Sequence, residues 1–168
     1  FIIYFNLNVL NSIIFLLIFL VGILSDNNKL SSPKIRFLLQ FAIIILFIKF
    51  NGTAIESLRI SFLDDLIKSS EIFSIFFTAF CLSILINGSN FIDGLNLQSS
   101  GYFISVLLAL VFNNHYSGHL IDLNLIINLL AILAAFIIYN FFSKSFFGDS
   151  GIYLISFIVG IIAIEFVS

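Results

Sequence analysis

A short segment near the carboxyl end, residues 146–151 (FFGDSG), places Asp149 between two glycines and directly before an apolar run. Glycine permits sharp turns and a close approach of the backbone to a ligand. At the start of a helix, free N–H groups and the helix dipole favour a bound phosphate. The carboxylate is a hard oxygen ligand for Mg²⁺, which proteins commonly bind through one or two carboxylates together with substrate phosphates. An ordinary helix cap would use the same residue types, so both interpretations stay open.

A second polar segment follows the third apolar run and repeats polar side chains at intervals of three: Asn87, Asn90, Asp93 and Asn96. Positions three apart lie along one flank of a helix. Amide side chains both donate and accept hydrogen bonds, which suits a nucleobase or a ribose. Hydrogen bonding between membrane helices is the alternative use of Asn. Four polar residues in register exceed what packing requires, so we interpret this flank as a binding surface.

A third cluster follows the first apolar run. Asp26 comes directly after Ser25, and Pro33, Lys34 and Arg36 follow a short polar stretch. Proline is well placed at a helix start, and the two basic side chains would lie near the membrane interface, where they could meet lipid or substrate phosphate. Composition alone favours a solvated loop with basic anchors.

The remaining ionisable residues give weaker signals. The adjacent pair Asp64-Asp65 is interpreted as part of a solvated loop, and so are His115 and His119, although their spacing of four also occurs in metal sites. Glu165 lies within an apolar run, where carboxylates are candidates for function.

The elements that must position these clusters are membrane helices. Of 168 residues, 61% are hydrophobic and 10% charged, whereas a soluble domain is about half apolar and about a quarter charged. A spanning helix needs about 20 apolar residues. We predict an all-α, polytopic transmembrane helix bundle of about six helices in a single domain over residues 1–168. The predicted segments are about 5–24, 35–50, 70–87, 99–112, 121–142 and 151–167.

Six crossings place the connections after the first, third and fifth segments on one face of the membrane. The three polar clusters lie in these connections, so distant parts of the chain can form one site. The other connections, 51–69 and 113–120, fall on the opposite face. Basic residues flank the two faces four to three, which favours a cytoplasmic position for the clusters.

Charge and chain ends limit the other possibilities. The sequence contains no basic run long enough for nucleic acid or for an anionic-lipid tether. It lacks Met, begins inside an apolar stretch and stops directly after another, so we expect the central part of a longer protein. The sequence leaves the oligomeric state open, a homodimer included.

Together the three clusters resemble the polyprenyl-phosphate N-acetylhexosamine-1-phosphate transferases, which include bacterial glycosyltransferase family 4 and the phospho-N-acetylmuramoyl-pentapeptide transferase. Those proteins carry an Asp-Asp motif with a Leu-Ser-x-Lys-type segment, then Asn-x-x-Asn-x-x-Asp-Gly, then Phe-x-Gly-Asp-x-Gly. Residues 22–36, 87–96 and 146–151 match these motifs in the same order.

The resemblance implies a Mg²⁺-dependent enzyme of the bacterial plasma membrane that moves a sugar 1-phosphate from a UDP-sugar to polyprenyl phosphate and releases UMP. It implies a catalytic role for each carboxylate. Asp149 would bind the metal, Asp26 would lie near the lipid phosphate or act as its base, and Asp93 would line the nucleotide-sugar pocket. The resemblance also implies substrate-binding residues: Asn87, Asn90, Asn96, Lys34 and Arg36.

The sequence departs from the family pattern at two places. Ser25 stands where the first Asp of the pair is expected, and Asn96-Leu97 replaces a common Asp-Gly. A non-catalytic relative is therefore one alternative. A transporter or channel segment is another, although its carboxylates would be expected near the midplane rather than at helix ends.

Overall fold

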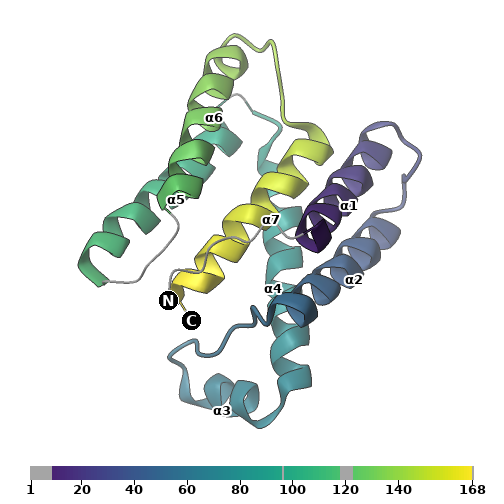
Figure 1. The fold of residues 1–168 in the computed structure, drawn as a ribbon. Helices are drawn as coiled ribbons and strands as arrows, with labels where there is room; N and C mark the ends of the chain where they lie inside the picture. Colours follow the sequence, from purple (N-terminus) through teal and green to yellow (C-terminus); the bar gives the residue numbers. More distant parts are fainter. Residues whose placement is uncertain (1–8, 96, 118–122, 168) are drawn as a thin grey trace.

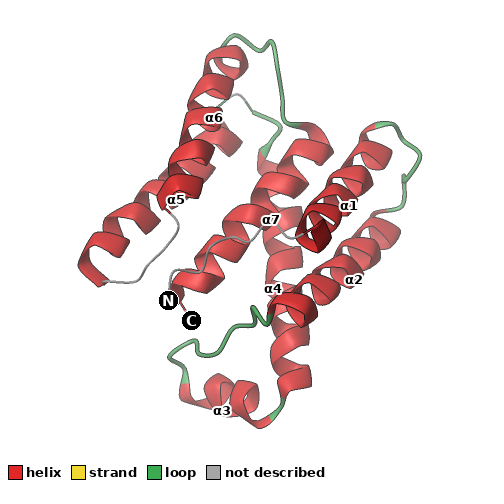
Figure 2. Cartoon of the chain, in the orientation of Figure 1, coloured by secondary structure: helices red, strands yellow, loops and turns green. Residues whose placement is uncertain are grey.

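The computed structural model describes residues 9–95, 97–117 and 123–167. In these ranges every regular element is a helix, which confirms the predicted all-α bundle (Figure 2). The helices are α1 (Val9–Asp26), α2 (Pro33–Asn51), α3 (Ser61–Ser69), α4 (Glu71–Ile92), α5 (Gln98–Ser117), α6 (Leu123–Phe141) and α7 (Gly148–Val167).

The six predicted apolar segments correspond to α1, α2, α4, α5, α6 and α7, with longer helices in places. Helix α4 continues through residues 88–92, which we expected in a connection. Helix α5 continues to Ser117, so His115 belongs to a helix and not to a loop. His119 lies outside the described residues.

Helix α3 was not predicted, because its nine residues include three charged side chains. Ile67 faces the bundle and is buried, whereas Phe62, on another side of the helix, is exposed. The preceding loop folds onto Asp64, whose carboxylate accepts hydrogen bonds from the Leu58 amide at 2.7 Å and the Ser57 hydroxyl at 2.8 Å. These hydrogen bonds hold the pKa of Asp64 below its ordinary value, and the bond from the Leu58 amide has the largest effect. Asp64 and Asp65 thus lie on a helix and not in a loop, which corrects the loop interpretation, and Asp64 holds the preceding loop against α3.

Four helices are long and apolar enough to cross a membrane within the described ranges: Val9–Asp26, Glu71–Ile92, Leu123–Phe141 and Gly148–Phe166. Helix α2 is of similar length but carries three basic residues near its ends, and the apolar part of α5, Gln98–Asn113, is shorter. Large apolar side chains point outward, for example Ile132 and Ile138 at 60% and 61% exposure. Such a surface suits lipid, and the chain is a multi-pass membrane protein.

Helix α7 is the central element of the bundle. It packs against α1, α4 and α5, while α2 packs against α1 and α4, and α6 against α5 (Figure 1). Phe157 on α7 contacts Phe15 of α1 and Phe47 of α2, with ring centroids 5.7 and 5.2 Å apart. The core around α7 therefore fixes the position of its first turn relative to α1 and α2.

The connections α1–α2, α4–α5 and α6–α7 lie at one end of the bundle, and α3 lies at the other (Figure 1). This arrangement agrees with the alternation deduced from six crossings. The end that carries the three connections also carries the three polar clusters.

Candidate functional site

The first turn of α7 lies directly against the last turn of α1. Gly22 makes this approach possible, because a Cβ atom there would lie 2.3 Å from Ser150 Cα and 2.6 Å from its nitrogen. Both are backbone atoms, which cannot turn aside as a flexible side chain could. The Asp26 and Asp149 motifs therefore meet through a glycine contact.

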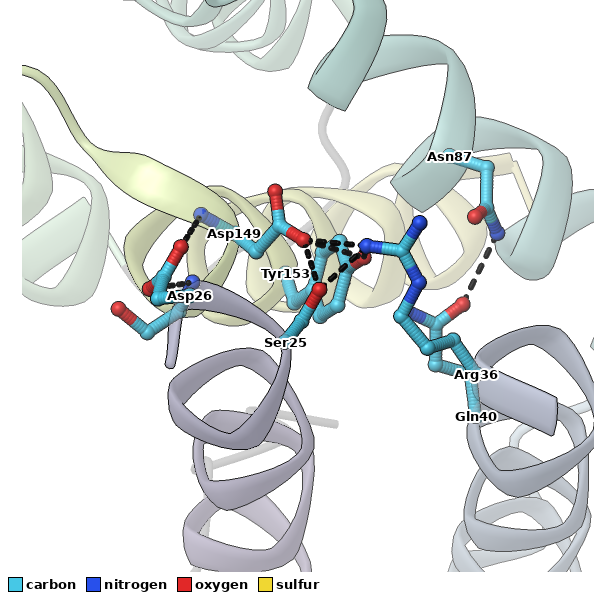
Figure 3. Close-up of polar contacts among 8 residues, drawn as sticks. Ser25, Asp26, Arg36, Gln40, Asn87, Asp149 and Tyr153 are labelled. Carbon is cyan, nitrogen blue, oxygen red and sulfur yellow. Dashed lines mark hydrogen bonds and ion pairs between the residues drawn. The ribbon is translucent and has the colours of Figure 1, made fainter. Parts of the chain in front are cut away.

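Two carboxylates from other helices cap the first turn of α7. Asp26 accepts hydrogen bonds from the amides of Asp149 at 2.8 Å and Ser150 at 3.1 Å (Figure 3). Asp93 accepts a hydrogen bond from the Gly148 amide at 3.1 Å. Gly148 has φ of +64°, and a Cβ there would lie 3.1 Å from both carboxylate oxygens of Asp26.

The amides at the start of α7 are thus not free, which favours helix capping over phosphate binding, the two uses of this segment that the sequence left open. Carboxylates satisfy the amides of Gly148, Asp149 and Ser150, and the Phe147 carbonyl accepts from the Gly151 amide at 3.3 Å. The amino end of α7 stabilises the charges of Asp26 and Asp93, because it is the positive end of the helix dipole. The cap interpretation of Asp149 is therefore wrong, because the carboxylates that cap α7 are Asp26 and Asp93 and not Asp149 itself.

The Asp149 side chain faces α1 and α2 instead. One carboxylate oxygen, Oδ2, accepts hydrogen bonds from the Ser25 hydroxyl, from Arg36 Nη1 at 2.6 Å and from the Tyr153 hydroxyl at 3.2 Å (Figure 3). Arg36 Nη1 also donates to the Ser25 oxygen. The Arg36 and Asp149 side chains are 22% and 20% exposed, so the ion pair is only partly open to solvent.

Asp93 is partly buried beside the first turn of α7. Its Oδ1 accepts a hydrogen bond from the Ser99 hydroxyl at 2.6 Å. Burial raises the pKa of the Asp93 carboxyl above its ordinary 3.8, and the negative charges of Asp149 and Asp26 act in the same direction. The hydrogen bonds from Ser99 and Gly148 oppose this change without reversing it.

The raised pKa predicts how stability depends on pH. The folded protein holds the Asp93 proton more tightly than the unfolded chain does. Stability from this group is therefore present below pH 3.8 and is lost as the pH rises through the raised folded-state value. Asp93→Asn keeps an acceptor for the Gly148 amide and a donor for Ser99 but cannot ionise. We expect the unfolding temperature in detergent to fall less with rising pH in this variant than in wild type. The same pH dependence in both proteins would contradict the assignment of this effect to Asp93.

The predicted binding residues do not all join this centre. The Asn87 amide donates to Gln40 Oε1 at 2.9 Å and to the Ser83 carbonyl at 2.7 Å. Asn90 lies one turn further along α4 and is half-buried. Asn96 lies outside the described residues. The structure therefore brings together Asp26, Asp93, Asp149 and Arg36. Asn87 reaches this group only through Gln40, which follows Arg36 by one turn on α2 (Figure 3).

Lys34 is exposed and lies beside a groove of about 540 Å³ between α2 and α4. The groove is lined by Pro33, Lys34, Phe37, Leu38 and Asn87, and its walls are largely apolar. It places a cation next to an apolar surface at the end of the bundle that carries the site.

The chain matches a known protein family over nearly its whole length. The model of the family described as glycosyl transferase family 4 matches residues 9–167. The chain belongs to glycosyl transferase family 4. No curated protein and no solved structure matches the chain.

Several residues of this family 4 site were not predicted from the sequence as contacts. Ser25 was noted only as a departure, yet it binds both Asp149 and Arg36. Tyr153 and Gln40 follow Asp149 and Arg36 by four positions, the spacing that puts side chains on one helix face. That spacing was the available signal, whereas nothing in the sequence marks Gly22 as a contact between helices.

The side chains that could serve as metal ligands limit how Mg²⁺ could bind to this family 4 chain. Within the described ranges, no three His, Cys, Asp or Glu side chains lie close enough to hold a metal ion. Asp26 and Asp93 are engaged with backbone amides, which leaves the second oxygen of Asp149, Oδ1, pointing away from its three donors (Figure 3). One such carboxylate fits Mg²⁺ in the mode that relies on substrate phosphates for further ligands.

Proposed function

We propose that this protein transfers a sugar 1-phosphate, with an N-acetylhexosamine as the sugar, from a UDP-sugar to polyprenyl phosphate in bacterial cell-envelope polysaccharide synthesis. The observation that carries the proposal is the convergence of three motif carboxylates and Arg36 at one end of the membrane helices, in a chain of glycosyl transferase family 4. A water-soluble nucleotide and an insoluble lipid phosphate can meet at such an edge.

In the proposed reaction, an oxygen of the lipid phosphate forms a bond to the β-phosphorus of the UDP-sugar. The bond from that phosphorus to the bridging oxygen breaks, and UMP leaves with the electron pair. Both reactants are anions, so their approach must be compensated by positive charge. Mg²⁺ bound at Asp149 would neutralise phosphate charge and orient the diphosphate.

The protein's own residues would bind and orient the two substrates. Arg36 and Lys34 supply positive charge, Arg36 at the carboxylates and Lys34 beside the apolar groove. That pairing of a cation with an apolar surface suits the phosphate and the first part of the chain of polyprenyl phosphate. Asp93, Asn87, Asn90 and Asn96 would face the nucleotide sugar.

Asp26 would have to change its hydrogen bonds to act as a base. Both its oxygens accept amide hydrogen bonds from α7, so it must release one of them to act as a base toward the lipid phosphate. Positioning of Asp149 through the first turn of α7 is the role it can perform without any rearrangement.

We place the active face in the cytoplasm and the protein in the bacterial plasma membrane. The four-to-three excess of basic residues on that face and the need for a cytoplasmic UDP-sugar support this placement.

A non-catalytic relative is the second candidate, and Ser25 in place of a carboxylate is the observation that favours it. The test is UMP release by the full-length protein in detergent, with Mg²⁺, undecaprenyl phosphate and UDP-N-acetylglucosamine. Lipid-dependent release supports the transferase. Release with another UDP-sugar alone would correct the substrate, and silence with a full donor panel would favour the non-catalytic relative.

A further inference from the structure

The Arg36 guanidinium lies against the Asp149 carboxylate, where a metal ion would also bind. Its Nη1 lies 2.6 Å from Asp149 Oδ2, and the same nitrogen contacts the hydroxyls of Ser25 and, at 3.5 Å, Tyr153. The side-chain hydrogen bonds that Arg36 makes with described residues all start at Nη1, and a second guanidinium nitrogen points away from Asp149 (Figure 3).

Ser25 makes this arrangement possible. Its hydroxyl donates to Asp149 and accepts from Arg36, so it lies between the two charges as a neutral group. A second carboxylate at this position would leave an excess of negative charge for a metal. With Ser25, the Asp149 carboxylate pairs with the Arg36 guanidinium without a metal ion, while the charges of Asp26 and Asp93 face the amides of α7.

The electrostatic consequence is weak metal binding in the empty site. A divalent ion at Asp149 would lie within a few ångströms of the Arg36 charge, in a place only about one-fifth open to solvent. Like charges at such distances repel strongly at the effective dielectric of a protein surface. The charges of Asp26 and Asp93 lie nearby and offset part of this repulsion, but their oxygens accept hydrogen bonds from α7 amides and are not free to act as metal ligands.

A nucleotide diphosphate would relieve the repulsion between Arg36 and the divalent ion. Guanidinium groups bind phosphate oxygens through paired, charge-assisted hydrogen bonds, and the outward nitrogen of Arg36 is in a position to begin such a contact. Once Arg36 binds phosphate, the Asp149 carboxylate and the same phosphates can share a metal ion.

We propose that Arg36 couples the two binding events: it neutralises Asp149 in the empty site and moves to the nucleotide diphosphate when a divalent cation binds Asp149. This inference rests on the proposed function. Cation and nucleotide then bind with positive cooperativity, and each raises the affinity for the other by the same factor, typically about 5- to 150-fold in coupled systems.

The test measures Mn²⁺ binding to the full-length protein by electron paramagnetic resonance, with and without UDP, and uses Asp149→Asn to identify the signal from this site. We expect Arg36→Gln to bind Mn²⁺ alone at least about fivefold more tightly than wild type, and UDP to tighten binding less in the variant than in wild type. Lys144→Gln is the matched control, because it removes an exposed positive charge from the same end of the bundle without contacting Asp149.

Each outcome is decisive. If Arg36→Gln binds Mn²⁺ no more tightly than wild type, while Asp149→Asn loses the signal, the coupling is wrong and the metal site stands. If Asp149→Asn changes nothing, the metal assignment in the proposed function fails and the coupling fails with it. Should Arg36→Gln not fold, wild type alone still tests the proposal, because UDP must tighten the Asp149-dependent Mn²⁺ signal.

Discussion

Asp149→Asn is expected to lower UMP release by roughly a thousandfold, equivalent to about 4 kcal/mol of transition-state stabilisation. The amide preserves the shape of the side chain and can still accept from Ser25 and Tyr153, which contact the carboxylate in the native protein. It removes the charge that would hold Mg²⁺ and that pairs with Arg36. Initial rates of UMP release at saturating donor and lipid phosphate measure the effect.

Asp65→Asn is the matched control for this experiment. It removes the charge of an exposed carboxylate on α3, at the opposite end of the bundle from the site. Its rate should equal that of wild type. An Asp149→Asn protein that remained folded and kept more than about a tenth of the wild-type rate would contradict a metal-binding role for Asp149.

Gly22→Ala has the second-largest expected effect. A Cβ atom 2.3 Å from Ser150 Cα must push α1 and α7 apart, and overpacking of this kind costs about 1–3 kcal/mol. The shift would also separate Asp26 from the amides of Asp149 and Ser150. We therefore expect the variant to unfold at lower temperature and to lose most of its UMP release.

Gly101→Ala shows whether the loss is specific to the crossing of α1 and α7. A Cβ at Gly101 would meet open space within α5, and Ala in a helix is favoured over Gly by about 0.5–1 kcal/mol. This control should unfold at the wild-type temperature or slightly above. Equal unfolding temperatures for Gly22→Ala and wild type would show that the two helices do not meet as closely as described.

The sequence predicted which clusters come together, because the number of membrane crossings decides which connections share a face. Asp26, Asp93 and Asp149 could be brought together by that argument without any knowledge of helix packing. The sequence could not predict which group each carboxylate contacts. A helix start flanked by glycines suits a phosphate and a carboxylate equally well, and only the packed structure shows that Asp26 and Asp93 reach the α7 amides first.

The missed features depend on close contacts between helices. Gly22 lies in an apolar run, where a glycine gives no sign of what lies against it, and Ser25 looked like the loss of a functional group rather than a partner for Arg36. Helix α3 was overlooked because it is short and three of its nine residues are charged. Substrate binding by Asn87 was predicted from its spacing and from the family resemblance and stays a prediction, but the contacts of its amide with Gln40 and the Ser83 carbonyl were not indicated by the sequence.

The most direct test of the proposed transfer follows the β-phosphate of the donor. The full-length protein is incubated with Mg²⁺, undecaprenyl phosphate and UDP-N-acetylglucosamine radiolabelled in that phosphate, and the label is measured in the lipid and nucleotide fractions. The proposal predicts that the label enters the lipid fraction together with the sugar and that unlabelled UMP is released. Label that stayed in released UDP, with an unlabelled sugar on the lipid, would show transfer of the sugar without its phosphate and would contradict the account.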